Sequence, residues 1–487
     1  MVPNFNFGSN SSRIRAVSPK HIIVSAGFVD TLTAVQPLLE ASPRVWTHGA
    51  TDSDFGRIDL DIERHSSKLL SRDERRQTNI DDLALHIYTS GTTGLPKAAN
   101  VSHARVMQWS HWFAGMMEVQ SSDRMYNCLP MYHSVGGVQA PGAILAGGGS
   151  VVIREKFSAS QFWGDIVHWD CTLFQYIGEL CRYLLRTSPC KQETEHRIRL
   201  ACGNGLSAEI WDAFKDRFRI PRILEFYAAT EGNISLFNVQ GKRGAIGHIP
   251  AYLAHRFSPA LVMHDAETGE PARNEHGFCI RCAPNQHGEA LSKAIGDPAN
   301  IGSRFEGYTS EEASEKKILR NVFEPGDAWV RSGDLMRRDE KGYFFFIDRV
   351  GDTFRRKGEN VAASEVAEAI CAFPGIQHAN VYGVPVPGTD GRVGMAAVVA
   401  RDELDLTGFR KHISEALPAY ARPVFLRIRK QVDVTGTFKY SKTELIRQAY
   451  DPEACDDSLY FDNLEAGRFV LLDAELFRRI HAGGVRL

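Results

Sequence analysis

A run of glycines and hydroxyl side chains that ends in a lysine is the part of this sequence best suited to chemistry. It reads Tyr88-Thr-Ser-Gly-Thr-Thr-Gly-Leu-Pro-Lys97 and follows the apolar residues 83–87. Glycine lets backbone N–H groups approach a phosphate closely, the hydroxyls add donors, and the lysine brings a positive charge to the same oxygens. The run therefore predicts a loop that binds a nucleotide polyphosphate. The residues expected to form its contacts are Thr89, Ser90, Gly91, Thr92, Thr93, Gly94 and Lys97.

A flexible Gly/Ser/Thr linker is the alternative interpretation of this run, because such a composition alone permits one. The Gly-Lys-Ser/Thr ending of the Walker A loop is also absent from it. A linker, however, has no reason to follow a buried strand or to end in Pro96-Lys97. We therefore favour the phosphate loop.

Five later segments carry glycines, carboxylates and cations that a nucleotide site could use. They are Leu129-Pro-Met-Tyr-His-Ser-Val-Gly-Gly137, Ala201-Cys-Gly-Asn-Gly-Leu206, Glu225-Phe-Tyr-Ala-Ala-Thr-Glu231, Ser332-Gly-Asp-Leu335 and Thr435-Gly-Thr-Phe-Lys439. Each has an ordinary interpretation when taken alone: a core histidine, a strand-to-helix turn, or a solvated surface charge. Their order along the chain is the argument for a shared function.

Together these motifs resemble those of the adenylate-forming enzymes, which include acyl-CoA synthetases, luciferases and the adenylation domains of peptide synthetases. The resemblance implies that ATP and Mg²⁺ are used to join a small-molecule carboxylate to AMP. In acyl-CoA synthetases, the thiol of coenzyme A then displaces the AMP. The implied fold is α/β, with a large N-terminal domain of parallel-rich sheets and helices and a small, mobile α+β C-terminal domain.

The resemblance assigns the expected chemistry to four positions. Lys439, on the small domain, is expected to bridge the substrate carboxylate and the α-phosphate. Thr230 is expected to contact the α-phosphate, and Glu231 to hold Mg²⁺, which favours hard oxygen ligands. His133 is expected to border the acyl pocket. Cationic groups are needed because a carboxylate must attack a polyanion while both reactants are held in line.

The other motif residues are expected to hold the nucleotide. By resemblance, the ring of Tyr227 stacks on adenine, Asp334 accepts the ribose hydroxyls, and Arg349 contacts the ribose or a phosphate. Adenine and the acyl chain are expected to lie along a glycine-rich turn, because a side chain there would occupy the space of the ligand. That turn contains Gly203, Asn204 and Gly205.

Apolar runs of strand length alternate with amphipathic stretches, which is typical of an α/β protein with much parallel sheet. The runs are residues 83–88, 151–153, 173–177, 199–201 and 223–226. The character of the chain changes near Val350, where we predict a boundary between a large domain, 1–350, and a small domain, 351–487. Gly351 lies at the hinge position of the family, about which the small domain is expected to rotate between the two steps.

A self-contained pattern of helices and strands follows this boundary. Ser364 is expected to cap a helix that ends before Pro374. Strands are expected over residues 379–384 and 395–400, and a second helix ends at Pro418. The apolar faces of the two helices are formed by Val366, Ile370, Phe373, Phe409, Ile413 and Leu417.

Composition bounds the class of protein. With 487 residues, 43% of them apolar and 24% charged, the chain is expected to be globular. A net charge of -2 gives no electrostatic reason to expect nucleic acid as a partner. The nine scattered cysteines are expected to be reduced and mostly structural. We expect a cytoplasmic protein without a membrane-spanning helix. Peripheral membrane attachment and oligomeric state stay open. The ending Val485-Arg486-Leu487 is a weak match to a peroxisomal address.

Details of the motifs resemble one branch of the family, the fatty acid transport proteins and very-long-chain acyl-CoA synthetases. They are the Thr435–Lys439 motif, Lys357-Gly-Glu-Asn360, Val350-Gly-Asp-Thr-Phe-Arg355 and the run Gly232-Asn-Ile-Ser-Leu-Phe-Asn238. The branch implies a CoA ligase for a long or very long fatty acid, or for a bulky apolar carboxylate such as a bile acid. A fatty acid uptake protein and an inactive shortened homologue are the alternatives. The early position of the phosphate loop implies that the opening elements of the large domain are missing.

Overall fold

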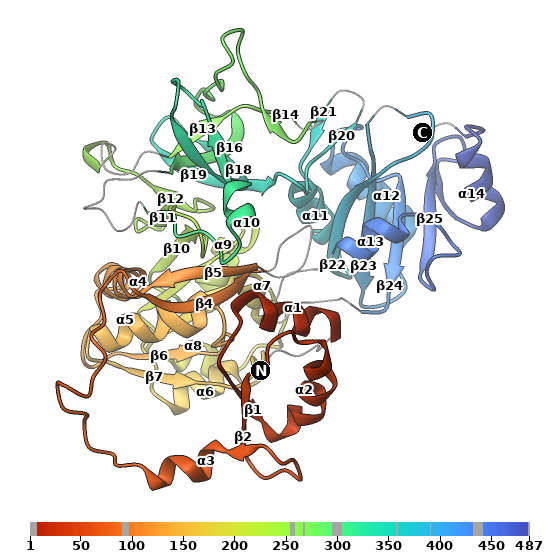
Figure 1. The fold of residues 1–487 in the computed structure, drawn as a ribbon. Helices are drawn as coiled ribbons and strands as arrows, with labels where there is room; N and C mark the ends of the chain where they lie inside the picture. The colour runs from red at the N-terminus through yellow and green to blue at the C-terminus, as the bar shows by residue number, and fades with distance from the viewer. Residues whose placement is uncertain are drawn as a thin grey trace. The chain divides into compact units, whose positions relative to one another are not determined.

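The computed structural model describes residues 7–89, 97–253, 259–265, 268–294, 304–356, 359–389, 391–431 and 442–485 (Figure 1). The chain divides into two compact units. Unit 1 comprises residues 1–235, 239–243 and 294–318, and unit 2 comprises residues 236–238, 244–293 and 319–487. The predicted boundary near Val350 falls within unit 2, so the division into residues 1–350 and 351–487 stays a prediction.

Unit 1 begins with a small sheet of three parallel strands and the helices next to it. The strands are β1 (His21–Ser25), β2 (Arg44–His48) and β3 (Gly56–Arg57), and the helices are α1 (Phe7–Val17), α2 (Val29–Val35) and α3 (Ile58–Asp61). An antiparallel pair follows, formed by β4 (Leu83–Thr89) and β5 (Lys97–Ser102). The predicted phosphate loop connects this pair.

The centre of unit 1 is a parallel sheet in the order β10-β9-β8-β6-β7. Its strands are β6 (Arg124–Asn127), β7 (Ser150–Ile153), β8 (Leu173–Ile177), β9 (Leu200–Asn204) and β10 (Ile223–Ala228). β8 and β9 are almost entirely buried, as expected of parallel strands covered on both faces. The predicted α/β class with parallel-rich sheet is confirmed.

Helices alternate with these strands along the chain (Figure 1). They are α4 (His103–Met116), the π-helical turn η4 (Val135–Gln139), α5 (Ala140–Ala146), α6 (Phe162–His168), α7 (Gly178–Leu185), α8 (Gln192–Glu195) and α9 (Ala208–Arg217). Helix α10 (Glu311–Glu315) also belongs to unit 1 but comes later in the chain. Ser102 caps α4, because its hydroxyl accepts a hydrogen bond from the backbone N–H of Arg105. This cap places the start of α4 directly after β5.

Unit 2 contains an antiparallel sheet in the order β12-β19-β18-β16-β13. Its strands are β12 (Gly247–His248), β13 (Ala260–Val262), β16 (His287–Lys293), β18 (Ala328–Arg338) and β19 (Tyr343–Arg349). Shorter strands are β11 (Ser235–Asn238), β14 (His264–Asp265), β15 (Glu270–Pro271), β17 (Ile318–Arg320), β20 (Phe354–Arg356) and β21 (Glu359–Val361).

The C-terminal part of unit 2 is a mixed sheet with helices against it. The sheet has the order β22 (Ile376–Val384), β23 (Val393–Ala400), β24 (Phe425–Arg429), β25 (Ser458–Asn463) and β26 (Arg468–Leu471), and only its β23–β24 pair is parallel. The helices are α11 (Ala363–Cys371), α12 (Leu406–Ala416), α13 (Thr443–Gln448) and α14 (Ala474–His481).

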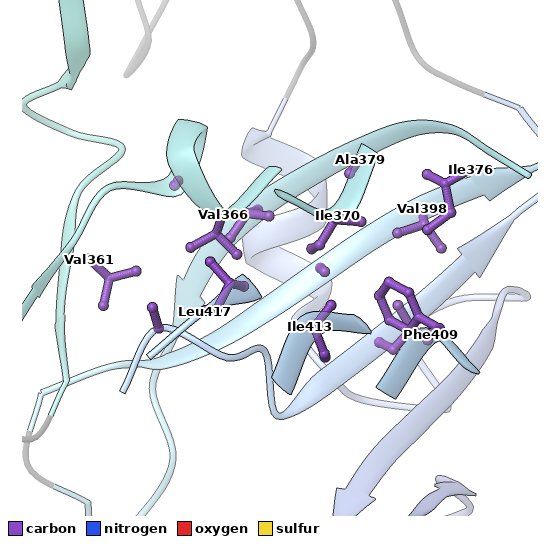
Figure 2. Packing of buried hydrophobic residues seen from close by; sticks show 14 of the residues in the cluster. Val361, Val366, Ile370, Ile376, Ala379, Val398, Phe409, Ile413 and Leu417 are labelled. Atoms are coloured by element: carbon purple, nitrogen blue, oxygen red, sulfur yellow. The ribbon is translucent and has the colours of Figure 1, made fainter. Parts of the chain in front are cut away.

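Helices α11 and α12 bury the apolar faces that the sequence predicts. Val366 and Ile370 of α11 gather with Phe409 and Ile413 of α12 over strands β22 and β23 (Figure 2). The predicted cap is wrong: the N-cap position of α11 is Ala362. The Ser364 hydroxyl instead donates to the carbonyl of Ile347 at 2.5 Å, because the preceding strand β19 lies within its reach.

None of the helices in the described part of the chain is both long and apolar enough to span a bilayer.

Candidate functional site

The two ends of the predicted phosphate loop lie opposite each other. Thr89, the last residue of β4, is paired with Lys97, the first residue of β5. The Thr89 hydroxyl donates to the carbonyl of Lys97 at 3.4 Å. The predicted contacts Ser90, Gly91, Thr92, Thr93 and Gly94 lie outside the described residues. The antiparallel pair therefore fixes where the loop leaves and rejoins the fold.

Tyr308 lies between the loop lysine and the predicted metal ligand. The Nζ of Lys97 is 5.3 Å from the centroid of the Tyr308 ring. The hydroxyl of the same ring donates to Oε1 of Glu231 at 2.7 Å. The pKa of Tyr308 is raised, first by burial and then by the negative charge of Glu231, so the phenol keeps its proton and stays a donor. One aromatic side chain thus connects two predicted site residues.

A second cation reaches the same carboxylate oxygen. The Nζ of Lys317 is 3.7 Å from Oε1 of Glu231, and the two side chains are 25% and 13% exposed. The partial burial of both groups reduces the screening of their interaction by solvent. Glu231 is therefore held by a neutral donor and by a positive charge.

The backbone around Tyr308 is fixed by its pairing with β5. Tyr308 forms a bridge with Ala99, and the N–H of Asn100 donates to the carbonyl of Gly307 at 3.0 Å. The N–H of Thr309 donates to the carbonyl of Ala98 at 3.0 Å. Since β5 begins at Lys97, the strand that carries the loop lysine also pairs with the backbone of Tyr308.

Arg105 ties the residue after Glu231 to the segment before Tyr308. Its guanidinium, on α4 and only 3% exposed, donates to the carbonyls of Gly232 at 2.6 Å and Arg304 at 2.5 Å. Its Nε lies 3.6 Å from the carboxylate of Glu306, which also accepts from the Ser102 hydroxyl at 2.6 Å. The buried guanidinium thus donates to two carbonyls and lies beside a carboxylate, although its Nε has no hydrogen-bond partner among the described residues. The two hydrogen bonds connect α4 to both segments.

Thr230 lies next to the segment that contains His133. The Thr230 hydroxyl is 3.3 Å from the hydroxyl of Ser134. The Nδ1 of His133 accepts from the backbone N–H of Val135 at 3.5 Å, at the start of the π-helical turn η4. The structure therefore brings Thr230 and the His133 segment together, as the motif order predicts, while the expected role of His133 beside an acyl chain stays a prediction.

The glycine-rich turn and Tyr227 lie on neighbouring parallel strands. Gly203 on β9 is paired with Tyr176 on β8 and with Glu225 on β10. Tyr227 follows near the end of β10 and is half-buried. The carboxyl ends of adjacent parallel strands are a usual ligand-binding edge in α/β folds. Gly203, Asn204, Gly205 and Tyr227 are thus positioned at one edge of the sheet.

The remaining described candidates belong to unit 2. Asp334 on β18 is paired with Arg349 on β19, and Nε of Arg349 is 3.9 Å from Oδ1 of Asp334. Gly351 follows β19 in a turn, and a Cβ added there would meet no atom within 4 Å. Lys439 lies outside the described residues. The roles of these four residues stay predictions.

The Glu231 site fits a magnesium ion that shares its coordination with a triphosphate. The carboxylate is a hard oxygen ligand, and Mg²⁺ usually takes one or two protein carboxylates together with phosphate oxygens and water. Among the described residues there is no group of three or more His, Cys, Asp or Glu side chains that could hold a metal. A phosphate-bearing ligand would have to complete the coordination shell that Glu231 begins.

Sequence reasoning missed Arg105, Glu306, Tyr308 and Lys317. Their roles depend on contacts with distant parts of the chain, and no local glycine or hydroxyl pattern marks them. The adjoining Gly307 has a φ of +65°, a conformation that favours glycine, but this angle is known only from the structure.

Two family models match this sequence. The AMP-binding enzyme model matches residues 10–281, and the AMP-binding enzyme C-terminal domain matches residues 365–439. Long-chain fatty acid transport protein 1 of Mus musculus is 45% identical over 410 residues, which cover 84% of this chain and 63% of the mouse protein. Long-chain fatty acid transport protein 6 of Homo sapiens is 39% identical over 495 residues, which cover 99% of this chain and 78% of the human protein. The chain thus spans less than two thirds of the mouse relative.

Solved structures share the fold. ATP-bound MatB from Rhodopseudomonas palustris matches with a TM-score of 0.73 and 22% identity, over 92% of this chain and 82% of that chain. The anthranilate CoA ligase AuaEII in complex with anthranoyl-AMP matches with a TM-score of 0.74 and 19% identity, over 93% and 83% of the two chains. With a family model over more than half of its length and relatives close to 40% identical, the chain belongs to the AMP-binding enzyme family, as a relative of the long-chain fatty acid transport proteins.

Proposed function

We propose that this chain is an ATP- and Mg²⁺-dependent acyl-CoA ligase. It activates a long or very long fatty acid as an acyl-adenylate and then transfers the acyl group to coenzyme A. The observation that carries the proposal is the grouping of Lys97 and Glu231 about Tyr308, whose ring is 5.3 Å from the ammonium and whose hydroxyl is 2.7 Å from the carboxylate. A cation and a carboxylate at one site suit a metal–triphosphate complex.

In the first step, a carboxylate oxygen of the fatty acid attacks the α-phosphorus of ATP. A new P–O bond forms, the bond to the bridging oxygen breaks, and pyrophosphate leaves with the electron pair. Lys97 would neutralise phosphate charge, the Thr230 hydroxyl would donate to the α-phosphate, and Lys439 would bridge the two reactants, as the family resemblance implies. Magnesium held by Glu231 would supply further charge neutralisation when bound.

In the second step, the sulfur of coenzyme A attacks the acyl carbonyl, and AMP leaves as the thioester forms. An acyl-adenylate hydrolyses readily, so water must be kept from it between the two steps. Rotation of the region after Gly351 would exchange Lys439 for the groups that admit coenzyme A.

The substrate class rests on the names of the relatives. Both are called long-chain fatty acid transport proteins, whereas the structural neighbours are named as ligases or bound to nucleotide. Those names also favour a second candidate, a protein that captures fatty acids without chemistry. The buried network around Glu231 argues for the ligase, because a passive carrier needs no such charge arrangement.

Carboxylate-dependent exchange of radiolabelled pyrophosphate into ATP tests the proposal. The panel should contain medium, long and very long fatty acids and a bile acid, with Glu231→Gln as the inactive control. We expect exchange to be greatest with the long or very long acids and thioester to form when coenzyme A is added. Binding of fatty acid without exchange at any chain length would favour the carrier and overturn the ligase.

A further inference from the structure

Glu225 is a buried carboxyl group to which the proposed mechanism assigns no role. It lies in the middle of β10 and is 1% exposed. It precedes Tyr227 by two positions, and residues two apart on a strand point to the same face. A carboxyl group is rarely buried this completely unless specific partners hold it.

Its partners are the glycine-rich turn and one tyrosine. Oε1 of Glu225 accepts from the backbone N–H of Leu206 at 3.2 Å and from the backbone N–H of Gly205. Oε2 accepts from the hydroxyl of Tyr176 at 2.5 Å. The carboxyl group therefore joins β10 to the turn after β9 and to the end of β8.

The backbone of neighbouring segments packs closely against this turn. A Cβ on Gly178 would lie 1.6 Å from the carbonyl oxygen of Gly205, and a Cβ on Gly203 would lie 2.3 Å from the carbonyl oxygen of Tyr176. Gly205 itself has a φ of +84°, which favours glycine. Close backbone contacts therefore limit movement of the turn, and Glu225 holds it by two of its N–H groups.

We propose that Glu225 is a positioning residue that sets residues 203–206 as the surface on which the adenosine part of the nucleotide binds. This inference rests on the proposed function, because it requires that the turn contacts nucleotide. Glu225 would not touch the ligand. It would act through the backbone of the turn and through the neighbouring position of Tyr227.

The energetics of the site support a specific role. Burial raises the pKa of Glu225 to about 8, although the bonds from Tyr176, Gly205 and Leu206 act in the opposite direction. A carboxyl group is thus kept in a place that disfavours its charge. An apolar residue of similar size would avoid this cost but would leave two N–H groups of the turn unpaired.

Four variants of the full chain separate positioning from packing. Glu225→Leu removes the acceptor, and Glu225→Asp keeps the acidic group but withdraws it from the turn. Glu225→Gln keeps an oxygen that can accept both N–H groups. Tyr176→Phe is the matched control, because it removes a buried hydrogen bond to the same carboxyl group and leaves the bonds to the turn in place.

Isothermal titration calorimetry measures the Kd of each variant for AMP and for ATP with magnesium. The melting temperature of each variant is measured without nucleotide. Leaving the turn N–H groups unpaired should weaken nucleotide binding about 10-fold or more in Glu225→Leu and Glu225→Asp. Glu225→Gln should restore the Kd to within about 3-fold of wild type, and Tyr176→Phe should resemble it. If Glu225→Leu fails to fold, the Kd of Glu225→Asp compared with that of Tyr176→Phe tests the inference.

The outcomes distinguish the inference from the proposed function. A folded Glu225→Asp protein that melts earlier but binds AMP as tightly as wild type would show a purely structural role and overturn the inference alone. A wild-type protein that binds neither AMP nor ATP would overturn the proposed function, and the inference with it.

Discussion

The hydroxyl of Tyr308 donates to Oε1 of Glu231 at 2.7 Å, across 77 positions of sequence. The bond closes a path from the loop lysine to the carboxylate, because the ring of Tyr308 also faces the ammonium of Lys97 at 5.3 Å. The backbone of Tyr308 pairs with β5, on which the phosphate loop ends. The position of the Glu231 carboxylate is therefore tied to that strand. Tyr308 is therefore expected to determine where the carboxylate presents its second oxygen.

Tyr308→Phe tests this relationship, because it removes the donor and keeps the ring beside Lys97. A hydrogen bond to a charged group contributes about 1.5–3 kcal/mol, so pyrophosphate exchange should fall about 10-fold or more. The concentration of Mg²⁺ that gives half-maximal exchange should rise, because the carboxylate is less well oriented. Tyr252→Phe, at a tyrosine that is 74% exposed, is the control. Equal exchange rates in the two variants would contradict a positioning role for Tyr308.

Lys317 is expected to compete with the metal for the carboxylate of Glu231. Its Nζ is 3.7 Å from the oxygen that Tyr308 also contacts, and both charged groups are mostly buried. Lys317→Met should lower the Mg²⁺ concentration needed for half-maximal exchange by a few-fold, because about 0.5–1 kcal/mol of competing attraction is lost.

The neighbouring Lys316 provides the matched control. Its side chain is 70% exposed and its Nζ pairs with Glu312 at 2.6 Å. Lys316→Met removes the same charge one position away and should leave the Mg²⁺ dependence unchanged. A higher Mg²⁺ requirement in Lys317→Met would show that the lysine assists the metal and does not compete with it.

Asp348 should make the stability of the protein depend on pH. It is 3% exposed, and burial raises its pKa from 3.8 to about 6, despite Lys442 and the N–H donors of Arg349 and Ser364. Between these two pKa values the folded state binds more protons than the unfolded state. Stability is therefore lost as pH rises from about 4 to about 6.

Comparison with Asp348→Asn isolates this effect, because asparagine does not titrate. The free energy of unfolding of wild type minus that of Asp348→Asn should fall by about 2 kcal/mol between pH 4 and pH 7, which is most of the effect that 1.36 kcal/mol per pKa unit gives for the whole shift. Urea unfolding at several pH values measures this difference. Asp402→Asn, at an exposed position, is the control variant, and its difference from wild type should not fall in this way. A difference that stays constant across this range would exclude the expected protonation.

The parts of the site that could be predicted from sequence are those encoded locally. Lys97 follows its glycines within one loop, and Thr230 and Glu231 follow their strand directly, so residue type and spacing identified all three. Tyr308 could not be found in this way, because its role depends on a backbone bridge to Ala99 and a hydrogen bond to Glu231. Arg105 could not be found either, because its partners, the carbonyls of Gly232 and Arg304, are distant in the sequence.

The fold shows the same limit. Apolar runs identified β4, the strands β7 to β10 and the buried faces of α11 and α12, because hydrophobic periodicity is a local property. They missed β6 of the parallel sheet, and they did not show that β4 pairs antiparallel with β5, because an apolar run does not encode the direction of pairing. The cap of α11 was assigned wrongly to Ser364, since its hydroxyl is taken by the carbonyl of Ile347 in β19. A polar side chain near a helix start satisfies whichever backbone group the tertiary structure brings to it.

The two half-reactions should separate when Lys439 is changed. The resemblance to the family places this lysine at the carboxylate and α-phosphate during adenylation only, so Lys439→Ala should lower pyrophosphate exchange about 10²-fold, the scale of one preorganised charge donor. Thioester formation from supplied acyl-adenylate and coenzyme A should remain close to wild type, because Gly351 allows the region that follows it to turn. Lys430→Ala, at an exposed lysine after β24, should affect neither step. Equal loss of both half-reactions in Lys439→Ala would contradict alternation, because a lysine needed throughout could not leave the site between the two steps.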